Sequence, residues 1–123
     1  MPVRLRPADP SVVEQALQHR SPADDKLLTK HFLAVLAERA PGRSVEVRVP
    51  PYAAAQVIDG ARHTRGTPPA VIETDAATWI ALATGDLTWT EAIASGRITA
   101  SGERTDLSTY LPLTTKTTNK NED

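Results

Sequence analysis

The histidines of this sequence are its best candidates for acid–base chemistry or metal binding. There are three, and two of them, His19 and His31, fall on or beside predicted helices without an acidic neighbour at the i, i+4 spacing of a helical metal site. We interpret both as surface or boundary residues. The sequence therefore predicts no metal site and no cofactor.

The third histidine lies in a segment that could hold an anion. His63 stands between Arg62 and Arg65 and is followed by Gly66, so guanidinium groups and backbone N–H groups are available as donors. The alternative is a solvated connection or an irregular edge strand, because no glycine-rich phosphate-binding motif accompanies these residues. If the edge strand folds back, Glu73 can approach His63 and pair with it.

Nucleophilic catalysis has little support. The sequence contains no cysteine, which excludes a thiol nucleophile, a thiolate metal site and a disulfide. No G-x-S-x-G motif occurs, and a catalytic serine would need a base and an orienting acid beside it. Asp75, Glu91 and Asp106 stand where helices or turns are predicted to begin, and Glu73 fits the outward position of a strand. We predict that the protein is not an enzyme.

The charge balance argues against nucleic acid as a partner. The chain has 14 basic and 15 acidic residues, its net charge is −1, and the basic residues are scattered, whereas phosphate binding needs a net basic field. Residues 1–7 have no apolar stretch of signal-peptide length, and no run of about 18 apolar residues occurs. We expect a cytoplasmic protein without a transmembrane segment.

The first half of the chain is predicted to form two helices and then two strands. Asp9-Pro10 and Ser21-Pro22 are typical helix starts, with Asp24 in the acidic position of a capping box. Valines that alternate with polar residues from Val45 to Val49 indicate a half-buried strand. The predicted elements are helices over 10–19 and 22–40 and strands over 45–49 and 52–58.

The second half is predicted to form a strand, two helices, a strand and a final turn or two of helix. Thr74 or Asp75 begins a helix that stops at Gly85, and Thr88 with Glu91 forms a capping box. The predicted elements are a strand around 71–72, helices over 75–85 and 88–95, a strand over 97–101, and a last helical turn or two over 106–111.

These second-half elements resemble the C-terminal half of the sterol-carrier-protein-2-like family. An acidic residue caps a helix that ends on Gly, an Ala-containing helix closes on Gly, a strand reads Gly-basic-apolar-x-apolar-x-Gly, and a Leu-rich helix follows. The matching residues are Asp75, Trp79, Leu82 and Gly85, then Ala92 and Gly96, then Gly96-Arg97-Ile98-Thr99-Ala100-Ser101-Gly102, then Leu107 and Leu111. The resemblance is good over residues 70–112, and it is strongest to small stand-alone bacterial members.

The resemblance implies an apolar tunnel between helices and sheet that accepts lipids or fatty acyl chains. The residues on the matching elements that would line or close the tunnel are Trp79, Leu82, Leu87, Ile93, Ile98, Leu107, Tyr110 and Leu111. The expected function is non-catalytic binding of an apolar small-molecule ligand. Two alternatives stay open: a homodimer or protein-interaction module that buries the same apolar surface, and an accessory domain of a small-molecule enzyme that contributes Arg62, His63 and Arg65.

The expected architecture is α+β, with a mainly antiparallel sheet of four to five strands covered by helices on one face. We predict one domain over residues 1–113. Residues 114–123 contain no apolar side chain and are predicted to be a disordered polar tail.

Overall fold

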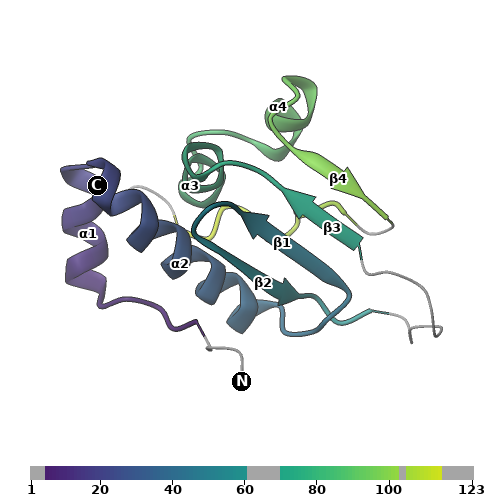
Figure 1. The fold of residues 1–123 in the computed structure, drawn as a ribbon, viewed down its shortest axis with the longest axis horizontal. Helices are drawn as coiled ribbons and strands as arrows, with labels where there is room; N and C mark the ends of the chain where they lie inside the picture. Colours follow the sequence, from purple (N-terminus) through teal and green to yellow (C-terminus); the bar gives the residue numbers. More distant parts are fainter. Residues whose placement is uncertain (1–4, 61–69, 103–104, 115–123) are drawn as a thin grey trace, which may run out of the picture.

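The fold was analysed in a computed structural model, which describes residues 5–60, 70–102 and 105–114 (Figure 1). Its helices are α1 (Pro10–Gln18), α2 (Pro22–Arg39), α3 (Ala76–Thr84) and α4 (Trp89–Ala94), and its strands are β1 (Val45–Val49), β2 (Ala53–Val57), β3 (Ala70–Glu73) and β4 (Thr99–Ser101).

The helices begin where their side-chain caps predict. The Asp9 carboxylate accepts a hydrogen bond from the Ser11 N–H, and the Asp24 carboxylate accepts from the Ser21 N–H. At α4, Thr88 and Glu91 form a reciprocal capping box. Such caps satisfy N–H groups that the first turn of a helix leaves without a partner, so these boundaries are set locally.

The four strands form one sheet in the order β2-β1-β3-β4. The outer pairs, β2 with β1 and β3 with β4, are antiparallel, and the central pair of β1 and β3 is parallel. In this register Val47 lies between Ala55 on β2 and Ile72 on β3. The α+β class and the mainly antiparallel sheet are thus confirmed, with a parallel pair at its centre.

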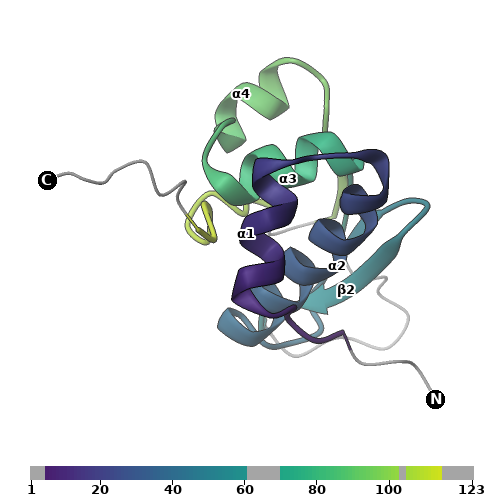
Figure 2. The ribbon, with the colours of Figure 1, turned by 90° about the vertical axis from the view of Figure 1, so that its left-hand side faces the viewer.

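One face of the sheet carries the core. Val45, Val47 and Val49 are fully buried, whereas Glu46 is half-buried and Arg48 is exposed on the opposite face. The helix α2 lies between the sheet and α1, so α1 forms an outer layer (Figures 1 and 2). Helix α1 buries Val13 and Ala16 and leaves Val12 42% exposed.

The segment after β4 differs from its prediction. Residues 106–111 form no helix; the Asp106 carboxylate accepts from the Ser108 N–H, and the Tyr110 N–H donates to the Leu107 carbonyl, which makes a turn. Pro112 follows at once and would interrupt a helix here. The chain then returns to α3, where the N–H groups of Leu113 and Thr114 both donate to the Ala83 carbonyl.

Thr114, the first residue of the predicted tail, thus contacts α3, and residues 115–123 lie outside the described residues. None of the helices in the described ranges has the length and apolarity needed to cross a membrane.

Candidate functional site

The predicted ligand-binding residues divide into a buried group and a partly exposed group. Trp79 and Leu82 on α3 are each 1% exposed, and Ile98 before β4 and Leu107 in the final turn are also buried. All four belong to one apolar cluster, and Leu87, Tyr110 and Leu111 pack against that cluster while staying half-buried. Ile93 on α4 is 45% exposed. Seven of the eight thus belong to the apolar core of the domain or pack against it, and this core also contains residues of α1 and α2.

Two contacts hold α3 at the centre of this region. The indole Nε1–H of Trp79 donates to the backbone carbonyl of Thr29 on α2 over 3.3 Å. At the other end of α3, the Ala83 carbonyl accepts both N–H groups of the returning C-terminal segment. The helix is therefore fixed to α2 on one side and to residues 113–114 on the other.

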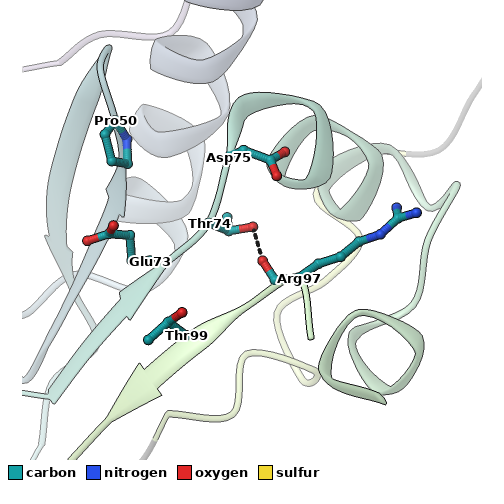
Figure 3. A pocket seen from close by; sticks show the side chains of 6 residues that line it. All are labelled: Pro50, Glu73, Thr74, Asp75, Arg97 and Thr99. Carbon is teal, nitrogen blue, oxygen red and sulfur yellow. Dashed lines mark hydrogen bonds between the residues drawn. The ribbon is translucent and has the colours of Figure 1, made fainter. Parts of the chain in front are cut away.

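A polar pocket of about 230 Å³ opens beside this apolar region, where β1 and β3 end and α3 begins. The residues that line it are Pro50, Glu73, Thr74, Asp75, Arg97 and Thr99 (Figure 3). Of these residues, the sequence pointed to a chemical role only for Glu73, as a possible partner of His63. The pocket follows from the parallel pairing of β1 with β3, because the carboxyl ends of parallel strands meet at one edge of a sheet.

Hydrogen bonds fix the backbone around the pocket. The buried Thr74 hydroxyl donates to the Arg97 carbonyl over 2.8 Å, which ties the entry of α3 to the segment before β4. The Thr74 N–H donates to the Arg48 carbonyl on β1. The Asp75 carboxylate accepts from the Thr78 N–H over 2.7 Å and caps α3. The pocket wall is therefore held by three separate elements of the fold.

The charged side chains of the pocket are exposed. Glu73, Asp75 and Arg97 all face solvent, and in Figure 3 the Arg97 side chain points away from Glu73 and Thr99. Arg48, the cation opposite Glu73 in the parallel register, instead donates from Nε to Glu46 over 3.0 Å and forms an ion pair with it from Nη2, also at 3.0 Å. The carboxylate of Glu73 consequently has no hydrogen-bond or ion-pair partner within the described part of the chain.

The other predicted polar residues are not brought to this pocket. His19 ends α1 and is exposed, and His31 is half-buried on α2 against the N-terminal segment. The basic group of Arg62, His63 and Arg65 lies outside the described residues. Across the described ranges, no group of three or more His, Cys, Asp or Glu residues is placed to hold a metal ion.

Comparison with protein families identifies one match. A family model described as "Bacterial SCP ortholog", where SCP stands for sterol carrier protein, matches residues 22–113, about three quarters of the chain. The match extends the resemblance over 70–112 upstream to the first residue of α2, and α1 precedes it. A comparison with curated proteins found no match.

Proposed function

The chain belongs to the bacterial sterol carrier protein family, and from this premise we propose that it is a non-catalytic carrier of an apolar ligand of the lipid or fatty acyl type. The ligand lies between α3 and the sheet. The alkyl chain of the ligand contacts the predicted residues of that region, and the ligand is released without chemical change. The cytoplasm remains the predicted location.

One observation carries the proposal. Seven predicted residues from separate parts of the family-matched region meet at the apolar core: four belong to its buried cluster, and three pack against that cluster while staying half-buried. The border residues Leu87, Tyr110 and Leu111 are half-buried, so they are the members that can move aside at the lowest cost in buried area. An acyl chain entering between them replaces their apolar contacts with its own.

The composition of this region supports adaptable packing. Aromatic residues make up 4% of the chain, and Ala83 and Ala92 are small side chains in the same buried cluster. A core built from small residues loses few dispersion contacts when a flexible alkyl chain takes the place of a neighbouring side chain. Binding of an alkyl chain therefore does not require a large permanent cavity.

Two measurements test the carrier function. Native mass spectrometry of the protein as purified reports bound lipid and subunit number together, which also tests the homodimer alternative. Titration with a fluorescent fatty acid should give saturable binding and change the tryptophan emission, to which Trp79 and Trp89 both contribute. Absence of both bound lipid and saturable binding would refute the proposal.

A lysine placed at the border of the apolar cluster tests where the ligand binds, and a lysine placed on α1 is its control. We expect Leu111→Lys to weaken fatty-acid binding by about tenfold or more, because an ammonium group beside an acyl chain must be desolvated. Val12→Lys introduces the same charge at an exposed position of α1, outside the family-matched region, and should leave binding unchanged. Equal affinity for the two variants would place the ligand elsewhere.

A further inference from the structure

The polar pocket contains an exposed carboxylate that apolar ligand binding does not use. Glu73 on β3 has Arg48 beside it in the parallel register and Thr99 opposite it on β4. The Arg48 guanidinium is bonded to Glu46 and forms no ion pair with Glu73. A negatively charged group is thus left at the pocket with a hydroxyl-bearing residue directly across the strand pair.

The remaining lining residues add acceptors more than donors. Asp75 contributes a second carboxylate, of which one oxygen is bonded to the Thr78 N–H. The Thr74 hydroxyl has its proton committed to the Arg97 carbonyl, and the Arg97 side chain is directed away from Glu73 and Thr99 (Figure 3). The lining therefore favours a cation with N–H donors over an anion.

The size and lining of the pocket narrow the class of cation. At about 230 Å³ it accommodates a small group and not a whole lipid. Quaternary ammonium groups are recognised by aromatic cages, and no aromatic side chain lines this pocket. Carboxylate and hydroxyl oxygens instead accept hydrogen bonds from a primary ammonium group. We propose that the pocket at Glu73 and Thr99 binds the primary ammonium group of a small amine or of a lipid headgroup.

Both sources of that group are compatible with the fold. Ile98, which lies between the pocket residues Arg97 and Thr99, is buried in the apolar cluster, whereas Glu73 and Thr99 are exposed on the face of the sheet that carries Arg48. A lipid with its headgroup in the pocket would therefore reach the apolar cluster around the edge of the sheet at Ile98. A soluble amine needs only the pocket, so the ammonium site does not depend on the carrier function.

The experiment compares ethanolamine and choline compounds that differ only in methylation of the nitrogen. Glycerophosphoethanolamine and glycerophosphocholine serve as probes without an acyl chain. Lysophosphatidylethanolamine and lysophosphatidylcholine, which carry one acyl chain, serve as lipid probes. Binding is followed by isothermal titration calorimetry to the wild-type protein, to Glu73→Gln and to Glu14→Gln. The last variant is the control, because it makes the same change at an exposed position of α1 outside the pocket lining.

We expect the ethanolamine compound to bind about fivefold or more tightly than its choline partner in the wild type, since it gains charge-assisted hydrogen bonds. Glu73→Gln should abolish this preference, Thr99→Val should reduce it, and Glu14→Gln should keep it. A preference in the tail-free pair supports the site and assigns it to soluble amines, whereas a preference confined to the lysophospholipids supports it and assigns it to headgroups.

Equal binding within both pairs, or a preference that survives Glu73→Gln, would overturn the proposal. Fatty acids carry no ammonium group, so their binding to Glu73→Gln should equal that of the wild type. Absence of an ethanolamine preference in the wild-type protein, with intact fatty-acid binding, thus contradicts the ammonium site alone. Absence of fatty-acid binding with an intact ethanolamine preference contradicts the carrier function alone.

Discussion

The backbone N–H of Ala8 donates a hydrogen bond to Nδ1 of His31 over 2.8 Å, and this contact fastens the segment before α1 to α2. The imidazole is half-buried, and its ring meets Phe32 edge-on at a centroid distance of 4.9 Å. Only an unprotonated Nδ1 can accept this hydrogen bond. Burial lowers the pKa of His31 below 6.5, and the negative charge of Glu38 on the same helix opposes that shift.

Acid should therefore loosen the N-terminal segment. Because the pKa of His31 is lower in the folded state than in the unfolded chain, the free energy of unfolding should be constant above about pH 6.5 and fall as the pH decreases toward the folded-state pKa. The charged residues nearest to Ala8 in the chain are Arg6 and Asp9, and the Asp9 carboxylate accepts hydrogen bonds from the N–H and the hydroxyl of Ser11. Hydrogen exchange of the Ala8 amide, together with urea unfolding between about pH 5 and pH 8, measures the effect.

The variant His31→Phe separates the effect of this hydrogen bond on the pH dependence of stability from the effects of other titrating groups. The variant keeps a ring against Phe32 but removes the acceptor, so it should lower the free energy of unfolding at neutral pH by about 1 kcal/mol and flatten its pH dependence. His19→Gln, at an exposed site, should keep the wild-type pH dependence. A His31→Phe protein with the wild-type pH profile would show that protonation of His31 does not loosen the segment.

Replacement of Thr29 by valine should stabilise the protein. Its side chain is fully buried on α2, and among the described residues its hydroxyl has no hydrogen-bond partner. Thr29→Val is expected to raise the free energy of unfolding by up to about 1 kcal/mol, because the unpaired hydroxyl is removed. Thr84→Val is the control: the Thr84 hydroxyl donates to the Ile80 carbonyl over 2.9 Å, and its loss should destabilise the fold by about 1 kcal/mol. Equal destabilisation by both variants would mean that the Thr29 hydroxyl is bonded in solution.

The hydrogen bond between Thr74 and Arg97 should contribute to stability as well as to the pocket. Thr74→Val keeps the shape of the buried side chain but leaves the Arg97 carbonyl without this donor, so we expect a loss of about 1 kcal/mol in chemical denaturation. Thr99→Val, exposed on β4, should change stability by less than about 0.5 kcal/mol. If the two variants are equally stable, this hydrogen bond does not hold the edge of the sheet.

Two glycines allow backbone strain to be separated from crowding. Gly96 and Gly102 both have positive φ values, +75° and +92°, but a Cβ at Gly96 would meet nothing within 4 Å, whereas a Cβ at Gly102 would lie 2.8 Å from the Cα of Ala70. Gly96→Ala should lower the free energy of unfolding by about 1 kcal/mol through strain alone, and Gly102→Ala should lower it further. Thermal denaturation of the two variants measures the difference, and equal losses would show that β3 moves aside freely.

The features that the sequence predicted well are those set by neighbouring residues. The starts of α1, α2, α3 and α4 depend on a capping side chain two or three positions away from its partner, and the alternating valines determine which face of β1 is buried. The final turn was predicted less well. Its cap at Asp106 and its apolar residues are compatible with a helix, and Pro112 with the return to Ala83 decides against it.

The candidate site was harder to predict because it depends on which strands are neighbours. Alternation assigns a face to each strand but does not say that β1 and β3 run parallel, and the pocket at Pro50 and Glu73 exists only because their ends coincide. The apolar residues were found from a family resemblance and share one cluster. Their role in ligand binding stays a prediction until a ligand is identified.

The parallel β1–β3 pair also bears on how fast the chain can fold. The β1–β2 pair closes over a short turn, Val49 facing Ala53, whereas Val47 and Ile72 must meet from distant parts of the chain. Loop-closure entropy opposes such a meeting before native contacts reward it. We infer that docking of β3 on β1 is the slow step of folding. Ile72→Val should then mainly decrease the refolding rate, while a change on the edge strand β4, such as Ala100→Gly, should mainly increase the unfolding rate.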